Sequence, residues 1–551
     1  MKTLRQNVAG EWSFTSGGSY ADPVGEVEVT VVFRREDGSG EWRVPAFWAG
    51  GQEWRVRFAS GVPGVYRFRS ECSGPSDSGL HGRTGSCRVV EYEGGNPLYR
   101  HGGVHVAADR RHFAHADGTP FLWVGDTWWM GLCSRLPWPQ GFRTLTADRV
   151  AKGFTVVQIV AGLYPDMPAF DPRGANEAGF PWTEGFGQIN PAYFDAADRR
   201  LRHLVEAGLV PCIVGCWGYY LPWLGMEKMR RHWRYLVARY GAWPVVWCLA
   251  GEGTMPYYLS ADPAADARLQ KTGWTELAAC VRSLDAFARP ITIHPSCSAR
   301  QCVTDVGVLD FDMLQTGHGD RGSLPNTVKQ VSVSYRATPV MPVVLGEVCY
   351  EGIGGCCGPE LQRWLFWACM LGGAAGFTYG ANGIWQVNTR PQPYGPSPHG
   401  MTWGNTPWEE AHRRPGSAQV GLGGRLLSRL PWWEIEPHPE WVEPGWNGSL
   451  DEQPFTCGRH DVPLAAGIPG RLRIIYCPLG TGLRRVKGIE AGVRYRVYLF
   501  DPLTGAVTAG GVAVADADGA WTPAMPGLPA WFPRPIYQDW VLVLTADGVE
   551  L

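Results

Sequence analysis

Residues 339–347, with the sequence PVMPVVLGE, are the stretch that decides the fold. They form a short, almost wholly apolar run of β-forming residues that ends on a carboxylate. This is typical of a strand that is buried on both faces and whose carboxyl end opens onto a cleft. A second run, WPVVWCLAGE at residues 243–252, has the same form. Two strand-terminal glutamates, Glu347 and Glu252, with helical sequence between them predict a parallel barrel with a pair of carboxylates at its C-terminal face.

The chain around these two runs repeats the same alternation of strand and helix. The helix expected after the second strand has both ends marked, with Asn190 as its N-cap, Pro191 at its first position and Gly208 as its stop. Eight strands alternating with helices match a (β/α)8 TIM barrel, in which Glu252 ends strand four and Glu347 ends strand seven. The eight strand-like runs lie at residues 121–129, 154–160, 209–215, 243–252, 291–294, 311–318, 339–347 and 376–382.

Both flanks of the barrel show the period of two that indicates antiparallel β-structure. We therefore expect three domains: an N-terminal β-sandwich at residues 1–95, the barrel at 96–430 and a C-terminal β-sandwich at 431–551. The segment from Trp385 to about Pro415 is rich in Pro, Gly and Asn, which predicts a loop over the barrel mouth. The N-terminal domain would either bind sugar or only brace the barrel.

Composition excludes some partners and favours others. A net charge of −2 over 551 residues gives no electrostatic case for nucleic acid or an anionic membrane. The 27 Trp suit stacking on the apolar faces of sugar rings, although large β-rich cores also use Trp. The 15 Cys are scattered through apolar segments without zinc-site spacing. No signal peptide or membrane-spanning run is recognisable, so we expect a cytoplasmic protein whose substrates are small imported oligosaccharides, and leave a homo-oligomer open.

The chemistry expected of this barrel rests on its two glutamates. Strands four and seven lie across a barrel from each other, so Glu252 and Glu347 can approach one glycosidic bond from opposite sides. If the carboxyl groups lie about 5 Å apart, one attacks the anomeric carbon while the other protonates the leaving oxygen. The alternative is that either glutamate is a structural carboxylate paired with an Arg. No P-loop, dinucleotide fingerprint or zinc spacing is present, so we expect no metal or nucleotide cofactor.

Other polar and aromatic residues fall at the predicted mouth, where they would bind sugar. For each polar residue a hydrogen bond within the barrel rim is an equal alternative, and each Trp could instead belong to the core. Glu351 follows Glu347 by four residues and is the main rival for the catalytic role, but its place in a loop would hold it less rigidly. The candidate substrate-binding residues are Asp126, Trp128, Gln158, Trp217, His318, Tyr379, Trp385 and Glu351.

The barrel contains, in this order, the motifs Gly125-Asp126-Thr127-Trp128, Ala250-Gly251-Glu252, Gly317-His318-Gly319, Gly346-Glu347 with Tyr350-Glu351, and Tyr379-Gly380-Ala381-Asn382-Gly383-Ile384-Trp385. They resemble the apiosidase-like glycoside hydrolases, whose barrels are similar to those of the wider clan A of retaining glycosidases. The resemblance covers nearly the whole chain, because residues 47–51 and 64–68 look like the β-domain that often precedes this barrel, and residues 500–505 look like its collagen-binding-like C-terminal β-domain. It implies that Glu252 is the acid/base and Glu347 the nucleophile.

Two departures limit what the resemblance implies. Many clan A enzymes have Asn before the acid/base, whereas this chain has Gly251, and apiosidases have Asp where Glu252 stands. Fold and reaction type therefore transfer, and apiose as substrate does not. The alternatives are a carbohydrate-binding protein on an inactive barrel, which the presence of both glutamates disfavours, and an inverting hydrolase or transglycosidase on the same scaffold.

Overall fold

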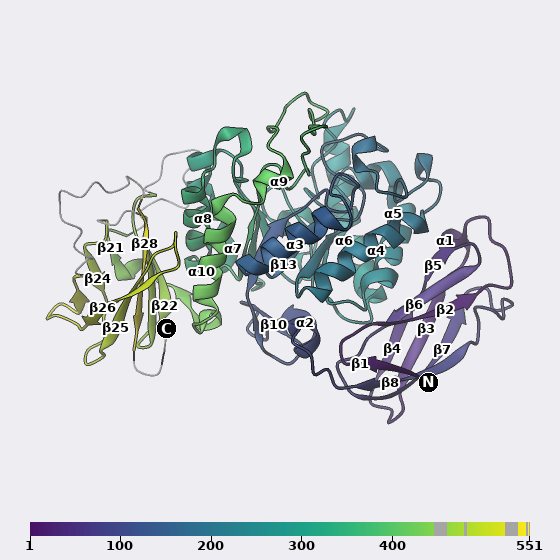
Figure 1. The fold of residues 1–551 in the computed structure, drawn as a ribbon, viewed down its shortest axis with the longest axis horizontal. Helices are drawn as coiled ribbons and strands as arrows, with labels where there is room; N and C mark the ends of the chain where they lie inside the picture. The colour runs from purple at the N-terminus through teal and green to yellow at the C-terminus, as the bar shows by residue number, and fades with distance from the viewer. Residues whose placement is uncertain (446–459, 479–481, 524–537, 547–548, 550) are drawn as a thin grey trace.

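A computed structural model describes residues 1–445, 460–478, 482–523, 538–546, 549 and 551. Figure 1 shows three parts in a row, with a barrel of strands and helices between two β domains at opposite ends of the molecule. The C-terminal part of the predicted third domain includes residues outside this described set. The predicted fold class, a (β/α)8 barrel flanked by β domains, is confirmed.

The central sheet consists of eight parallel strands in the order β16-β15-β14-β13-β12-β19-β18-β17. The two ends of this order approach each other, because the Asp310 amide donates to the Ile291 carbonyl at 2.8 Å and Thr292 Oγ1 donates to the Phe311 carbonyl at 2.9 Å. The sheet is thus nearly closed into a barrel. Its strands are β12 (Trp123–Thr127), β13 (Val156–Val160), β14 (Val210–Val214), β15 (Val246–Cys248), β16 (Ile291–Thr292), β17 (Asp312–Gln315), β18 (Val343–Glu347) and β19 (Gly376–Tyr379).

Helices cover the outside of the barrel, and the signals that predicted their ends are used in the structure. Asn190 accepts a hydrogen bond from the Ala192 amide as the N-cap of α4, and Gly208 has a φ of +86° just beyond its end. Between β16 and β17 the chain forms two short 3-10 turns instead of a helix. Of the helices in the described chain, none has both the length and the apolar character needed to span a bilayer.

The helices of the described chain are α1 (Pro23–Glu26), α2 (Pro97–Arg100), α3 (Gln140–Lys152), α4 (Pro191–Glu206), α5 (Tyr220–Tyr240), α6 (Pro263–Leu284), α7 (Leu324–Arg336), α8 (Pro359–Leu371), α9 (Trp408–Ala411) and α10 (Pro415–Leu427). The 3-10 turns are η1 (Pro172–Gly174), η2 (Glu184–Phe186), η3 (Ala299–Cys302), η4 (Val306–Val308), η5 (Asp320–Ser323), η6 (Ile353–Gly355), η7 (Trp432–Glu434) and η8 (Pro439–Trp441).

The N-terminal domain is built from two sheets, β1-β8-β7-β3-β4 and β2-β6-β5, which enclose an aromatic core of their own. Phe33 and Phe58 stack in that core with ring centroids 4.1 Å apart. A small sheet of order β11-β10-β9 links this domain to the barrel. The strands are β1 (Lys2–Arg5), β2 (Gly10–Thr15), β3 (Val29–Arg35), β4 (Glu41–Pro45), β5 (Phe47–Gly50), β6 (Glu53–Phe58), β7 (Gly64–Cys72), β8 (Thr84–Val90), β9 (Val104–Val106), β10 (Phe113–His115) and β11 (Pro120–Phe121).

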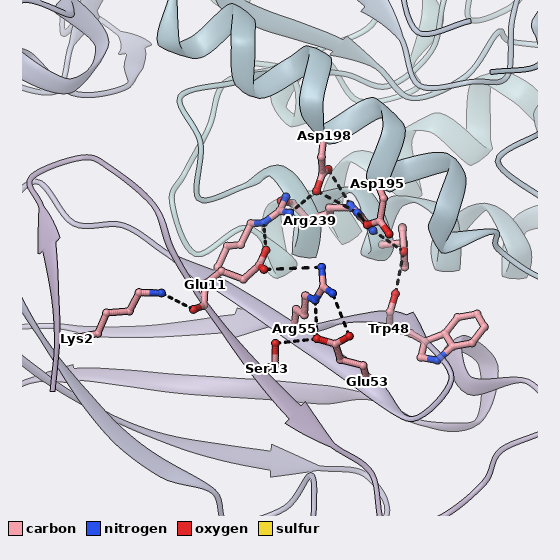
Figure 2. A network of polar contacts seen from close by, with 11 residues as sticks. Lys2, Glu11, Ser13, Trp48, Glu53, Arg55, Asp195, Asp198 and Arg239 are labelled. Carbon is pink, nitrogen blue, oxygen red and sulfur yellow. Dashed lines mark hydrogen bonds and ion pairs between the residues drawn. The ribbon is translucent and has the colours of Figure 1, made fainter. Parts of the chain in front are cut away.

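The contact between the N-terminal domain and the barrel combines ion pairs with ring contacts of Phe47 with Tyr235 and of Phe58 with Phe287. Asp198 of α4 accepts ion pairs from Arg239 of α5 and from Arg57 of β6, and the Arg57 guanidinium also donates to the Arg239 carbonyl at 2.7 Å. Figure 2 shows Asp195, Asp198 and Arg239 on the helices facing Glu11 and Arg55 on the sheet. Because all these charges are paired, the interface can be buried without an orphaned ion.

The C-terminal domain contains the sheets β20-β22-β23-β28-β25-β26 and β21-β24-β27. Arg363 of α8 pairs with both oxygens of Asp539 at 2.8 and 2.9 Å, and Trp367 of the same helix stacks on Tyr476 with ring centroids 6.2 Å apart. The strands are β20 (Glu436–Pro437), β21 (Val442–Glu443), β22 (Leu464–Ile468), β23 (Leu472–Cys477), β24 (Arg485–Lys487), β25 (Tyr495–Phe500), β26 (Val507–Ala513), β27 (Ala520–Trp521) and β28 (Trp540–Thr545).

Candidate active site

Both glutamates line one cavity of about 220 Å³ at the carboxyl ends of the barrel strands. Glu347 is the last residue of β18, and Glu252 follows the end of β15 at Cys248. Each carboxylate therefore lies at the barrel mouth, where residues at the carboxyl ends of parallel barrel strands are found. Trp385, His399 and Trp403, from the segment that precedes α9, line the same cavity. Figure 1 shows this segment at the top of the barrel beside α9.

Glu347 is held as an anion by two histidines. His318 Nε2 lies 2.8 Å from Oε1, and His294 Nε2 lies 3.1 Å from Oε2. His294 Nδ1 accepts from the Glu252 amide at 3.4 Å, so the imidazole proton is on the Nε2 that faces Glu347. Burial would raise the pKa of Glu347, but the bonds from His294 and His318 outweigh it and hold the pKa well below its usual value. The bond to Glu347 likewise raises the pKa of His318 against the effect of burial.

Glu252 has the opposite electrostatic environment. Its two oxygens accept hydrogen bonds from Gln315 Nε2 and Trp217 Nε1, each at 3.2 Å, and no cationic side chain pairs with it among the described residues. Burial, and after it the negative charge of Glu347, raise the pKa of Glu252 to about 7. Gln315 stands opposite Glu347 in the β17–β18 ladder, and its side chain extends to Glu252. Two carboxylates of the same type therefore differ in protonation at neutral pH.

Gly251 is required by the way Trp217 packs. A Cβ at position 251 would lie 2.1 Å from Cζ3 of the Trp217 ring, closer than any real contact. The backbones of Trp217 and Gly251 also form a parallel bridge, which fixes the ring there. The Asn that many clan A enzymes carry before the acid/base has no room here, and the indole of Trp217 occupies that side of Glu252.

Aromatic rings form the walls of the cavity. Trp129 Nε1 donates to the Tyr350 hydroxyl at 2.8 Å, and the Tyr350 and Trp385 rings are stacked with centroids 6.0 Å apart. Trp129 meets Trp217 edge to face at 5.5 Å. Flat apolar walls with a few polar groups between them suit the two faces of a sugar ring. The remaining lining residues are Pro165, Asp166, Met255, Tyr258, Ile353, His399 and Trp403.

Of the candidate residues predicted from the sequence, five lie together in this cavity. They are Glu252, Glu347, Trp217, His318 and Trp385. Their roles as catalytic or substrate-binding residues stay predictions.

The other five candidates, Asp126, Trp128, Gln158, Tyr379 and Glu351, lie outside the cavity lining and form hydrogen bonds within the barrel. Asp126 is fully buried, accepts from Arg149 Nε of α3 at 2.6 Å and accepts the indole N–H of Trp128. Gln158 Nε2 donates to the Gly346 carbonyl at 2.9 Å. The Tyr379 hydroxyl donates to Glu351, whose other oxygen accepts from the Gly416 amide at 3.2 Å. These side chains brace the barrel strands and α10, which is the alternative that sequence reasoning had left open for them.

Sequence reasoning missed several residues of the cavity. His294, which contacts Glu347 but does not line the cavity, is the last residue of a predicted strand, and Gln315, which lines it, lies within another. Strand-end position could have found both. Trp128 was the predicted substrate-binding residue, whereas its neighbour Trp129 lines the cavity. Asp166, Tyr258 and His399 lie in loops that carry no motif. Within the described part of the chain, no group of three or more His, Cys, Asp or Glu side chains is arranged to hold a metal ion.

Comparisons with known proteins agree with this geometry. Residues 107–434 match the family model described as "Apiosidase-like, catalytic domain", and residues 5–73 match a domain of unknown function, DUF5060. A search of curated protein sequences finds no match.

Among solved structures, a glycoside hydrolase shares 20% identity at a TM-score of 0.65, covering 83% of this chain and 100% of that one. A glycoside hydrolase family 5 protein from Bacteroides vulgatus ATCC 8482 shares 20% identity at a TM-score of 0.66, covering 83% and 95%. A second protein from the same organism, 17% identical with a TM-score of 0.68, covers 99% of this chain and 100% of its own. The fold of these proteins is thus similar to that of this chain over most of its length, and in the last case over 99% of it.

Proposed function

We propose that this protein, which belongs to the apiosidase-like family and is a glycoside hydrolase, acts with retention of configuration and removes single sugar residues from the ends of oligosaccharides or glycosides. Glu347 is the nucleophile and Glu252 the acid/base in this proposal. The observation that carries it is the opposite environment of the two carboxyl groups: histidines keep Glu347 ionised, while burial beside that anion raises the pKa of Glu252 to about 7. A double displacement needs one carboxylate and one carboxylic acid in the same cavity.

In the first step a Glu347 oxygen bonds to the anomeric carbon as the glycosidic C–O bond breaks, and the leaving oxygen takes the proton of Glu252. The glycosyl ester of Glu347 is uncharged, so the anion that helped to raise the pKa of Glu252 is gone at this stage. Glu252 is then a carboxylate suited to act as a base. In the second step it takes a proton from water, whose oxygen bonds to the anomeric carbon and releases Glu347.

The hydrogen bonds around the glutamates support this division of roles. His318 is hydrogen-bonded to one oxygen of Glu347 and His294 Nε2 lies 3.1 Å from the other, which restricts the carboxylate before substrate arrives. Gln315 and Trp217 hold Glu252 with neutral donors that stabilise its charge less than cations would. Exo action is supported by the cavity, whose volume of about 220 Å³ lies below the roughly 300–1,000 Å³ of sites for larger ligands.

The test compares Glu347→Ala with Glu252→Ala on glycosides with good and poor leaving groups. Glu347→Ala removes covalent catalysis for every substrate, and azide does not restore activity with retained configuration. Glu252→Ala keeps glycosylation by substrates with good leaving groups, because these need little protonation, and azide restores turnover to give a glycosyl azide of retained configuration.

The two variants have opposite expected signatures, so a folding defect cannot imitate the result. A first-formed sugar of inverted configuration, seen by NMR during hydrolysis, would instead establish an inverting enzyme. Near wild-type activity of Glu252→Ala on natural oligosaccharides would remove Glu252 from the mechanism. Transfer to an added alcohol acceptor in place of water would show a transglycosidase, and binding of sugar without turnover would show a carbohydrate-binding protein.

A further inference from the structure

We propose that Asp166 is the specificity-determining residue of this cavity, and that it selects an uncharged sugar by accepting one of its hydroxyl groups while repelling sugar acids. The proposal deepens the function above and rests on it. It concerns a residue outside the catalytic pair, contributed by the long loop between β13 and α4.

Asp166 lies in the cavity wall, where residues of two other loops hold its side chain. Its carboxylate accepts from the Tyr258 hydroxyl, which follows β15, and from Trp403 Nε1 at 2.9 Å, which follows β19. Asp166 is 6% exposed, and its backbone has a φ of +56°, which is uncommon for a residue other than glycine. A side chain held this firmly presents a fixed acceptor surface. Since a carboxylate offers about four acceptor sites and only two are used, room remains for hydroxyl groups of a ligand.

The cavity lining has more acidic than basic side chains. Asp166 and Glu347 contribute carboxylates, and Glu252 is the protonated acid when substrate binds. The imidazole of His318 is already bonded to Glu347, and no Arg or Lys is found among the described residues that line the cavity. Arg173 lies on the same loop as Asp166, but its guanidinium is bonded to Asp171 at 2.8 and 2.9 Å and to the Tyr394 carbonyl at 3.0 Å. The carboxylate of a uronic acid would therefore enter beside the carboxylates of Asp166 and Glu347 and find no Arg or Lys to pair with.

Two further groups of the cavity match a ligand rich in hydroxyls. Trp385 Nε1 is a donor and Gln315 Oε1 is an acceptor, both on residues at least nine-tenths buried, and neither has a hydrogen-bond partner within the described chain. Buried polar atoms are rarely left unsatisfied unless a ligand or water completes them. A sugar hydroxyl donates and accepts at once, so an uncharged sugar can satisfy Trp385, Gln315 and Asp166 together.

The test starts from the 4-nitrophenyl glycoside that the full-length wild-type enzyme cleaves best, and from analogues with a single hydroxyl replaced by hydrogen. For wild type, one deoxy analogue loses about 10- to 100-fold in kcat/KM, as expected for a hydrogen bond to a charged group. On the parent glycoside, kcat/KM of Asp166→Asn is lower than that of wild type by a similar factor, mainly because KM rises. For Asp166→Asn, kcat/KM on that one deoxy analogue is no lower than on the parent glycoside. Wild type cleaves hexuronides at least 100-fold more slowly than the matching hexosides, and Asp166→Asn narrows that ratio.

Matched variants separate sugar binding from loop support. Tyr258→Phe removes one donor to Asp166 but keeps the charge, so it changes activity less than Asp166→Asn and preserves the penalty for the deoxy analogue. Asp171→Asn, on the same loop and outside the cavity lining, keeps the wild-type pattern, and thermal unfolding verifies that each variant is folded.

Three results would overturn the proposal. One is a deoxy penalty in Asp166→Asn equal to that of wild type at every position. The second is a Tyr258→Phe variant that reproduces the whole effect of Asp166→Asn, and the third is a wild-type preference for uronides. In each of these cases hydrolysis by wild type would still stand, whereas a wild type that cleaves no glycoside would remove the proposed function and this inference together.

Discussion

Glu252 and Glu347 carry the same side chain, and their different neighbours determine the pH range in which the enzyme works. The acid/base must be protonated and the nucleophile ionised when substrate binds. The pKa of Glu252 is about 7 and that of Glu347 lies well below its usual value, so both conditions hold at any pH between these two pKa values. We therefore expect kcat/KM to be constant in weakly acidic solution and to fall tenfold per pH unit above about pH 7.

The measurement is kcat/KM against pH for wild type and for Glu252→Gln, using a substrate with a good leaving group. Glu252→Gln cannot ionise, so its glycosylation rate should be lower but should not fall as pH rises through 7. If kcat/KM falls above pH 7 in both proteins, the pKa belongs to another group. His318 is then the first candidate, because Glu347 raises its pKa.

How far the site could be predicted depended on residue parity within the strands. In a barrel strand that is buried on both faces, successive residues point to opposite sides, and the apolar sequence does not show which side faces the barrel axis. The sequence therefore located Glu347 at a strand end, but could not show that Asp126 faces Arg149 on α3 or that Trp129, rather than Trp128, reaches the cavity. Loop residues such as Asp166 could not be predicted, because contacts with two other loops place them.

Among the helices and strands, the regular parts of the fold were predictable from the sequence, whereas the absence of a helix between β16 and β17 was not. The helix caps of α4 and the alternating strands of the N-terminal domain follow from local chemistry that the chain itself displays. Between β16 and β17 the 3-10 turns η3 and η4 stand in place of a helix, and Arg300 of η3 is bonded to Asp312 of β17 at 3.0 Å. Interactions between segments distant in sequence leave no periodic signal.

The ion pairs between β6, α4 and α5 predict a large effect of a single substitution. Burial would raise the pKa of Asp198, but Arg239 and Arg57 hold it at about 2, below the value of 3.8 for an unperturbed carboxyl. Because the folded pKa is the lower one, the pairs stabilise the protein above about pH 4, and this contribution is lost as pH falls toward 2. Asp198→Asn should lower the free energy of unfolding by about 3–5 kcal/mol at pH 7, since it leaves two buried arginines short of an anion.

Thermal or denaturant unfolding of this variant is compared with Glu53→Gln, which removes a half-exposed carboxylate from a pair with Arg55 in the same domain. The control should change stability by less than about 1 kcal/mol. The difference between Asp198→Asn and wild type should shrink in acid. A loss that is independent of pH down to about 2 would show that packing, and not charge, makes the Asp198 contact important.

At the scale of the whole molecule, the two β domains are attached by different kinds of interface. The N-terminal domain has its own aromatic core and meets the barrel through ion pairs and a small apolar contact, in which Phe47 packs on Tyr235 and Phe58 on Phe287. The C-terminal sheet instead shares the apolar core of the barrel, because Leu472, Ile474, Val541 and Val543 pack in the same cluster as the residues of α8. Separating the two interfaces therefore has unequal costs, since exposed apolar area is far more unfavourable than exposed ions that can be hydrated.

We predict that a chain lacking residues 1–95 remains soluble and keeps hydrolytic activity with reduced stability, whereas a chain lacking residues 436–551 aggregates or fails to fold. In the second truncation Trp367, 1% exposed in the intact protein, would lose its stack on Tyr476, and Arg363 would lose Asp539. The measurements are soluble yield, thermal unfolding and kcat/KM of each truncated chain beside the full-length enzyme. A soluble, active barrel without residues 436–551 would mean that α8 and α10 can cover their own apolar faces, and that the shared core is an accessory to the barrel and not a condition for its folding.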